Sequence, residues 1–128
     1  MPRTALDTKL FTPIGPYSHA VVCGRHVYLS GTPGIDPDTG LLVDATAYGQ
    51  ARQALSNLIA MVEAAGGTEA DLVALQVHLV DVGDFKEMNR AFEALLSAPY
   101  PARTVFCTPA LPKAGALLTI SGTAVLGD

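Results

Sequence analysis

Two segments of the chain repeat apolar residues at the spacing of an α-helix. The first runs from residue 47 to residue 65 and is followed by Gly66 and Gly67, which predicts a helix that ends at the glycines. The second runs from residue 85 to about residue 97, and Asp84 and Glu87 stand at the positions of a capping box. The apolar stripes consist of Ala51, Leu55, Leu58, Ile59 and Val62 in the first segment and of Phe85, Met88, Phe92 and Leu95 in the second. Two amphipathic helices are therefore expected, and each needs an apolar surface to cover.

Elsewhere the apolar period is two, which is the period of a β-strand. A turn at Cys23-Gly24-Arg25, where glycine supplies a positive φ, joins the first two of these stretches into a predicted hairpin. The expected strands cover residues 20–22, 26–30, 72–80, 101–108 and 117–126, with a possible short extra strand at 41–43. This order of elements predicts an α+β two-layer sandwich in which both helices cover one face of a single mixed sheet. Residues 1–128 are expected to form one domain.

The alternation also predicts which side chains share each face of the sheet. Apolar residues such as Val27, Leu29 and Leu118, together with the odd-numbered positions from Val73 to Leu79, are expected under the helices. The opposite face is predicted to collect Tyr28, Ser30, Gln76, His78, Arg103, Val105, Cys107, Thr119 and Ser121. Two helices cannot cover both faces, and this second face is too apolar for water, so a homo-oligomer should bury it. A cavity at that interface would suit a small anion.

Charge and cysteine content exclude several classes of function. The formal net charge is −4, from 8 basic and 12 acidic residues, and no lysine or arginine cluster occurs, so nucleic acid is not an expected partner. Cys23 and Cys107 lack the spacing of a disulfide scaffold or of a metal site, which predicts free thiols in a reducing cytoplasm and no metal or cofactor. Neither a signal peptide nor a membrane span is indicated, so no membrane partner is expected.

Three residues stand out as candidates for ligand binding. Arg103 follows Pro101-Ala102 at the head of a predicted strand, a placement that suits bidentate capture of a carboxylate, although a salt bridge at a strand end is the alternative. Tyr17 lies in a stiff loop rich in proline and glycine at 12–18, where it is either a site residue or a cover for a sheet edge. Asn89, next to the apolar stripe, faces either inward or the solvent. The three histidines lack acidic partners at metal-ligand spacing, so structural or solvent-facing roles are expected for His19, His26 and His78.

With these residues assembled, the sequence resembles the RidA/YjgF/UK114 family of enamine and imine deaminases. The matching pieces cover nearly the whole chain in order. They are Ile14-Gly15-Pro16-Tyr17-Ser18, Leu29-Ser30-Gly31, Asp38-Thr39-Gly40, Gln50 through Asn57-Leu58, Ala64-Ala65-Gly66, Asp84-Phe85 with Asn89, Pro101-Ala102-Arg103 and Leu111-Pro112. The resemblance implies a chorismate-mutase-like fold, a homotrimer with sites between subunits, and hydrolysis of 2-imino acids, formed from enamines such as 2-aminoacrylate, to 2-oxo acids and ammonia.

The resemblance also implies roles for individual residues. Arg103 would bind the substrate carboxylate and the backbone at Gly31 would contact the substrate. Tyr17, Ser30 and Asn89 would shape the cavity.

The chain departs from the family pattern at two positions. Where active members resemble one another in a glutamate on the last strand that activates water, the matching position here is interpreted as Ser121, which can orient water but not take its proton. The family's cysteine, two residues after the arginine, is replaced by Val105, and Cys107 on the same strand face is expected to line the substrate site in its place. A non-catalytic trimer that binds small carboxylates or 2-oxo acids is therefore the alternative function. A ribonuclease activity, which family names sometimes carry, is disfavoured by the acidic charge.

Overall fold

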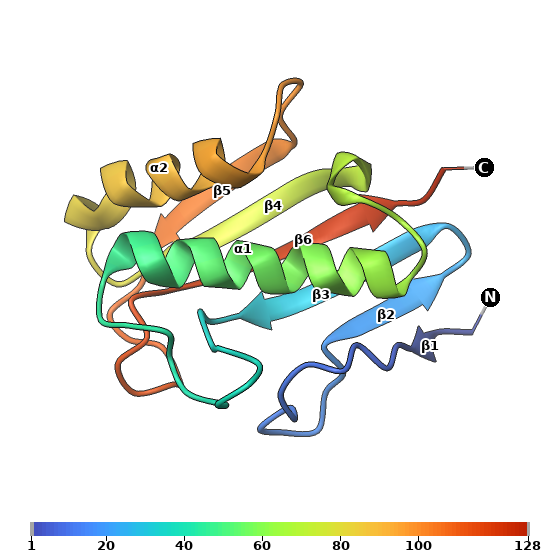
Figure 1. Cartoon of the computed structure of the whole chain (residues 1–128), viewed down its shortest axis with the longest axis horizontal. Helices are drawn as coiled ribbons and strands as arrows, with labels where there is room; N and C mark the ends of the chain where they lie inside the picture. Colours follow the sequence, from blue (N-terminus) through green and yellow to red (C-terminus); the bar gives the residue numbers. More distant parts are fainter. Residues whose placement is uncertain (1, 128) are drawn as a thin grey trace.

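A computed structural model describes residues 2–127 and shows two helices lying on one face of a mixed sheet (Figure 1). The six strands follow the order β1-β2-β3-β6-β4-β5. Only β4 and β5 are parallel, and the other neighbouring pairs are antiparallel. The elements are β1 (Thr4–Ala5), β2 (Ala20–Cys23), β3 (His26–Thr32), α1 (Ala47–Ala64), β4 (Leu72–Leu79), α2 (Phe85–Leu95), β5 (Ala102–Cys107) and β6 (Leu118–Val125). The two-layer α+β arrangement predicted from the sequence is confirmed.

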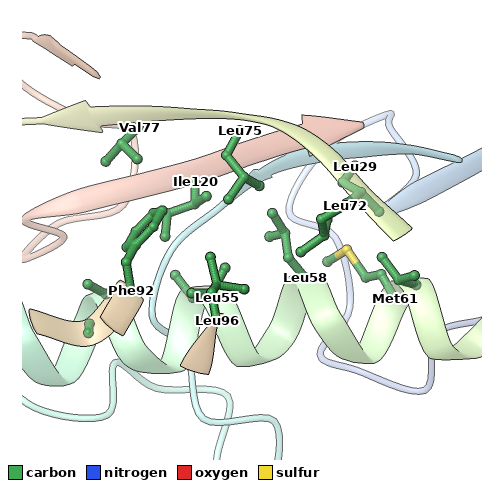
Figure 2. Packing of buried hydrophobic residues seen from close by; sticks show 14 of the residues in the cluster. Leu29, Leu55, Leu58, Met61, Leu72, Leu75, Val77, Phe92, Leu96 and Ile120 are labelled. Atoms are coloured by element: carbon green, nitrogen blue, oxygen red, sulfur yellow. The ribbon is translucent and has the colours of Figure 1, made fainter. Parts of the chain in front are cut away.

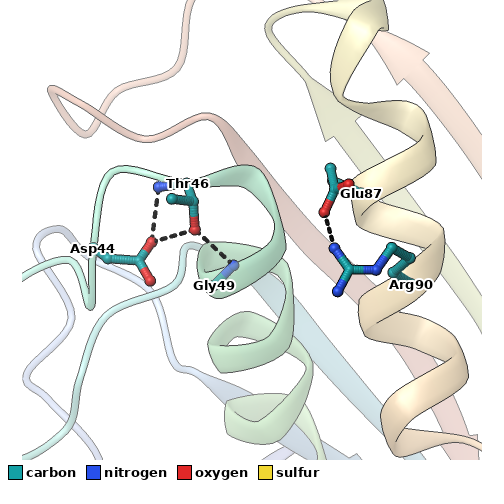
Figure 3. Close-up of polar contacts among 5 residues, drawn as sticks. All are labelled: Asp44, Thr46, Gly49, Glu87 and Arg90. Atoms are coloured by element: carbon teal, nitrogen blue, oxygen red, sulfur yellow. Dashed lines mark hydrogen bonds and ion pairs between the residues drawn. The ribbon is translucent and has the colours of Figure 1, made fainter.

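Helix α1 begins and ends where its sequence predicts. Thr46 is the N-cap, and its hydroxyl oxygen accepts a hydrogen bond of 3.0 Å from the Gly49 N–H (Figure 3). Asp44 in turn accepts from both the N–H and the hydroxyl of Thr46, each at 2.8 Å. At the other end Gly66 has a φ of +92°, the left-handed conformation that glycine adopts at little cost. These two ends set the bounds of α1, and its apolar stripe determines which face meets the sheet.

The core lies between the helices and the sheet (Figure 2). Leu55, Leu58 and Met61 of α1 are fully buried and point toward the sheet, Leu55 toward Ile120 of β6 and Met61 toward Leu72 of β4. Burial of each large apolar side chain contributes about 1.5–3 kcal/mol relative to exposure, so this layer dominates the stability of the fold. The helices cover one face only, so the face away from them, called the open face below, is covered by no helix among residues 2–127.

At the start of β4 the predicted alternation is wrong by one residue. Leu72 is 4% exposed and Val73 is 45% exposed, whereas Val73 was expected under the helices. The register with β6 shifts between Leu72 and Ala74, which is the mark of a β-bulge. Gly122 allows this irregularity, because a Cβ there would lie 2.5 Å from the Ala74 carbonyl oxygen. The extra residue returns Leu75 to the core side.

Two shorter predictions are also corrected. Asp84 makes no side-chain cap at the start of α2, because a 3₁₀ turn at Val82–Asp84 precedes the helix and leaves Asp84 itself with helical φ and ψ. Asp81 caps that turn instead, accepting from the Gly83 N–H at 2.8 Å. The proposed strand at 41–43 is a single bridge between Ile35 and Leu42. Within residues 2–127, no helix has the length and apolar character needed to cross a membrane.

Candidate functional site: two separate half-sites

Strand β5 places Arg103 on the helix side of the sheet. In the parallel register Arg103 lies beside Leu75, and paired residues in adjacent strands project to the same face. Leu75 is buried under the helices, so the prediction that Arg103 lies on the open face is wrong. Val105 and Cys107 share the face of Arg103, as expected. They therefore also lie on the helix side and not on the open face. The error arose because β5 is an edge strand with no clean apolar alternation, so its sequence does not reveal which face meets the helices.

Three side chains of helix α2 contact the Arg103 guanidinium. Asn89 Oδ1 accepts a hydrogen bond of 2.7 Å from Arg103 Nη1. The guanidinium carbon lies 5.0 Å from the centre of the Phe92 ring and 5.5 Å from that of Phe85, within the range of cation–π attraction. Residues 85, 89 and 92 are four and three positions apart, which puts them on one face of the helix. Partial burial lowers the pKa of Arg103, because desolvation disfavours the charged form.

A cavity of about 370 Å³ opens beside this arginine. Its walls are Asn89, Phe92, Glu93, Leu96, Tyr100 and Pro101, with Arg103 among them. A guanidinium carries five N–H donors in a planar fork, and Asn89 uses one of them. The remaining donors can bind a carboxylate through two hydrogen bonds. We call this group of residues the Arg103 half-site.

A second cavity, of about 290 Å³, lies where the loop around Tyr17 meets the ends of β3 and β6. Gly31 and Thr119 face each other here, since a Cβ on Gly31 would lie 3.9 Å from Thr119 Oγ1. The other walls are Phe11, Ile14, Pro33, Ile35, Pro112 and Lys113. No aspartate or glutamate occurs among the described residues that line it. We call this group the Tyr17 half-site.

A β-bulge positions Gly31. The register between β3 and β6 shifts between Leu29 and Thr32, and both of these residues are buried on the helix side. The intervening pair, Ser30 and Gly31, therefore interrupts the alternation, as bulges beside binding sites commonly do. Ser30 is held by three hydrogen bonds: its hydroxyl donates to the Ser18 carbonyl at 2.6 Å, its N–H donates to the His19 carbonyl at 2.9 Å, and its carbonyl accepts from the Thr32 hydroxyl at 2.7 Å.

Ser121 lies on the open face, as predicted, but in a different hollow from Thr119. Its hydroxyl donates to Gln76 Oε1 at 3.3 Å, in a shallow hollow of about 250 Å³ that Tyr28 and Ser30 also line. The residue of β6 that joins Tyr17 and Gly31 is thus Thr119. Sequence alternation had put both residues on this face. It did not show which of them lies against the bulge, because that depends on the register between β3 and β6.

The two half-sites do not meet within one chain. Arg103 lies on the helix side near the start of β5, and Thr119 lies on the open face, paired with His78 near the end of β4. The prediction that Arg103 and Ser121 share a face is therefore wrong. Cys107 is exposed at the end of β5 and lines neither half-site. Among residues 2–127, no cluster of three or more His, Cys, Asp or Glu side chains could hold a metal ion.

A family model described as Endoribonuclease L-PSP matches residues 8–126 of the chain. The chain belongs to this family, which is also known as RidA/YjgF. The family predicted from the sequence motifs is confirmed. Human 2-iminobutanoate/2-iminopropanoate deaminase is 38% identical over 125 residues, which cover 98% of this chain and 90% of the human protein.

Solved structures of the RidA/YjgF family share the fold. RidA from the Antarctic bacterium Psychrobacter sp. PAMC 21119 superposes with a TM-score of 0.91 at 40% identity, covering 96% of this chain and 99% of that chain. TdcF from E. coli, solved with bound serine, superposes with a TM-score of 0.88 at 31% identity, covering 97% of this chain and 99% of that chain. Both the sequence and the two-layer architecture therefore agree on the family.

Proposed function

We propose that this protein hydrolyses small 2-imino acids to 2-oxo acids and ammonia, at sites formed where copies of the chain meet. The observation that carries the proposal is the Arg103 guanidinium, which Asn89 and two aromatic rings hold at the wall of a cavity with donors left for a carboxylate. Relatives that match nearly the whole chain are named 2-iminobutanoate/2-iminopropanoate deaminases, among them the human and rat proteins at 38% and 39% identity.

A complete site needs both half-sites, and they lie on opposite faces of one sheet. Two copies of the chain can supply them, one contributing Arg103 and the other Tyr17, Gly31 and Thr119. The apolar character of the open face supports such an assembly, since Tyr28 and Phe106 project from it at 49% and 53% exposure. A homotrimer, with three such sites, is the assembly we propose.

The reaction would use the electrophilicity of the imine itself. Arg103 holds the carboxylate through two N–H groups, which fixes C2 of the imino acid at the cavity wall. Water adds to C2, the π electrons of the C=N bond move to nitrogen, and one proton of the water passes to that nitrogen, so a carbinolamine forms. The hydroxyl proton then passes to the amino nitrogen as the C2–N bond breaks and the C2–O bond becomes a carbonyl, which releases ammonia and the 2-oxo acid. Thr119 and the Gly31 backbone can orient the water, and no oxidant or cofactor is consumed.

Binding of small carboxylates without catalysis is the second candidate function. The specific observation that favours it is the lack of a carboxylate among the described residues of the Tyr17 half-site. A threonine or serine hydroxyl cannot take a proton from water near neutral pH, so general-base assistance is missing there. In this alternative Arg103 would bind the same carboxylate group, and Asn89, Tyr17 and Thr119 would only line the cavities.

Ammonia release from freshly generated 2-iminopropanoate and 2-iminobutanoate separates the two functions. We expect the purified full-length protein to accelerate release above the uncatalysed rate and Arg103→Ala to abolish the acceleration. Glu87→Ala is the matched control, because Glu87 lies on the same helix but pairs only with exposed Arg90 (Figure 3). If the parent protein binds pyruvate but releases no ammonia above background, the deaminase function is wrong and the binder remains.

A further inference from the structure

His19 is a buried histidine that the proposed reaction does not use. It immediately precedes β2 and is only 6% exposed. Its Nε2 lies 2.5 Å from the Phe11 carbonyl oxygen, and because a carbonyl can only accept, Nε2 must carry the proton. The imidazole meets the Phe11 ring edge-on at 4.7 Å between centroids and the Tyr17 ring edge-on at 6.1 Å. One side chain therefore contacts both ends of the loop that carries Tyr17.

The backbone of the same residue reaches the other wall of the Tyr17 half-site. The His19 carbonyl accepts from the Ser30 N–H at 2.9 Å, and Ser30 directly precedes Gly31 in the bulge. Between Phe11 and His19 the chain contains two prolines and a glycine, and the Tyr17 N–H donates to the Gly15 carbonyl at 2.8 Å. Proline nitrogens cannot donate, so this loop depends on side chains for its fixation. His19 thus ties the loop to the bulge.

We propose that His19 is a positioning residue that fixes the Tyr17 ring against Gly31. Its part in turnover rests on the proposed function, whereas its effect on Tyr17 does not. Without the Nε2 donor the Phe11 carbonyl loses this partner, and without the ring Tyr17 loses its edge contact. The Arg103 half-site is built from α2 and β5 and remains intact. Loss of His19 should therefore lower kcat and leave KM nearly unchanged, because carboxylate binding is preserved.

Two substitutions distinguish the effect of losing the hydrogen-bond donor from the effect of changing the side-chain volume. His19→Gln keeps an amide N–H at about the reach of Nε2, so most of the turnover and the loop order should be retained. His19→Leu keeps apolar volume but removes the donor, and we expect kcat for 2-iminopropanoate to fall roughly ten- to a hundredfold, the size of effect that a displaced cavity wall produces. Val62→Ala is the matched control, since it destabilises the core at the far end of α1, away from both half-sites.

A readout independent of activity uses ¹⁹F NMR of protein labelled with fluorotyrosine. The chain has 4 tyrosines, and Tyr17→Phe assigns the Tyr17 resonance. His19→Leu should shift or broaden this resonance and leave the other three unchanged, while His19→Gln and Val62→Ala should leave it near its parental position. Long-range ¹H–¹⁵N spectra of the unmodified protein should show His19 with its proton on Nε2, which tests the bond even if His19→Leu does not fold.

The outcomes also distinguish failure of this inference from failure of the proposed function. A parent protein without deaminase activity overturns the function, and the ¹⁹F and tautomer measurements still decide the role of His19. An unmoved Tyr17 resonance in folded His19→Leu, or a proton on Nδ1 in the parent, overturns the positioning role. If His19→Leu and Val62→Ala lower kcat equally, His19 contributes only to general stability. That result also overturns the positioning role.

Discussion

The two half-sites are built in different ways. The Arg103 half-site uses side chains from one face of α2 and one edge strand, so its parts lie within 19 residues of sequence, from Phe85 to Arg103. The Tyr17 half-site is assembled from a loop, a bulge and the start of β6, so Tyr17 and Thr119 come from opposite ends of the chain. If the proposed function holds, charge recognition is a local property of this protein, and the geometry around the reacting atoms is a long-range one.

This difference predicts different responses to mutation. At the first half-site a single charged group dominates, so its removal should eliminate binding. At the second the contribution comes from shape and orientation, so substitutions should change rates more gradually. The following experiments test that contrast, in order of decreasing expected effect.

Arg103→Ala should produce the largest loss. Two hydrogen bonds to a carboxylate contribute about 1.5–3 kcal/mol each, so kcat/KM for 2-iminopropanoate should fall roughly 10²- to 10⁴-fold. Arg103→Lys should recover only part of this, because an ammonium lacks the planar fork. Steady-state ammonia release and calorimetric titration with pyruvate measure both effects. If Arg103→Ala binds pyruvate as tightly as the parent protein, Arg103 is not part of the binding site.

Thr119→Glu should produce the largest gain. Thr119 lies in the cavity with Tyr17 and Gly31, where a carboxylate could take a proton from the attacking water. General-base assistance is typically worth about 10²–10⁴-fold, and we expect a gain in kcat near the lower end. Ser121→Glu is the matched control, because Ser121 occupies the other hollow beside Gln76 and should give little gain. A larger gain from Ser121→Glu than from Thr119→Glu would show that residue 121, and not residue 119, lies beside the attacking water.

Asn89→Ala should have a smaller effect on the first half-site. It removes the 2.7 Å bond to Arg103 but leaves the aromatic rings and the charge in place. A loss of about 1 kcal/mol corresponds to roughly fivefold weaker carboxylate binding, expressed in KM rather than kcat. Titration with pyruvate measures it, and Glu87→Ala should match the parent. A loss equal to that of Arg103→Ala would mean that Asn89 itself contacts the ligand.

Gly31→Ala should have the smallest effect. The nearest atom to a Cβ would be Thr119 Oγ1 at 3.9 Å, an ordinary contact, and the residue has no positive φ, so folding should be unaffected. The added methyl narrows the cavity where substrate and water would meet, and turnover should fall by a few-fold at an unchanged melting temperature. Thermal unfolding and ammonia release together check this. A large drop in melting temperature would show that the bulge tolerates no side chain.

The sequence predicts the layers of this fold well and its registers poorly. The stripe on α1 and the alternation on β6 are local patterns, and both give the correct buried faces. The side of Arg103 depends on its pairing with Leu75, which no pattern within β5 contains. Likewise Leu72 takes the core position expected for Val73 because Gly122, fifty residues away, lets the backbones approach. Short β1 has only two residues and no alternation to detect.

The residues of the candidate site divide in the same way, into those that local motifs predicted and those that depend on strand register. Tyr17, Gly31, Asn89 and Arg103 were singled out from motifs, and the structure brings Asn89 to Arg103 and Tyr17 to Gly31. Thr119 was placed on the open face but was not chosen over Ser121, because that choice requires the register between β3 and β6. Phe85 and Phe92 were assigned only to the core stripe of α2. Their second role beside the guanidinium depends on where the edge strand lies.

The bulge at Ser30 and Gly31 has a consequence for the kinds of mutation that this gene can tolerate. Loss of one codon from this pair would remove the bulge and leave Thr32, now 1% exposed, on the helix side and paired with Ile120. The tight packing of Gly34 against α1, where a Cβ would lie 2.4 Å from the Gln50 carbonyl oxygen, would then be kept. Loss of a codon earlier in β3 would instead turn core residues such as Val27 outward. A one-residue deletion at the bulge should therefore spare the fold and disrupt the Tyr17 half-site, whereas a deletion elsewhere in β3 should unfold the protein, and a deletion scan through β3 would show the contrast.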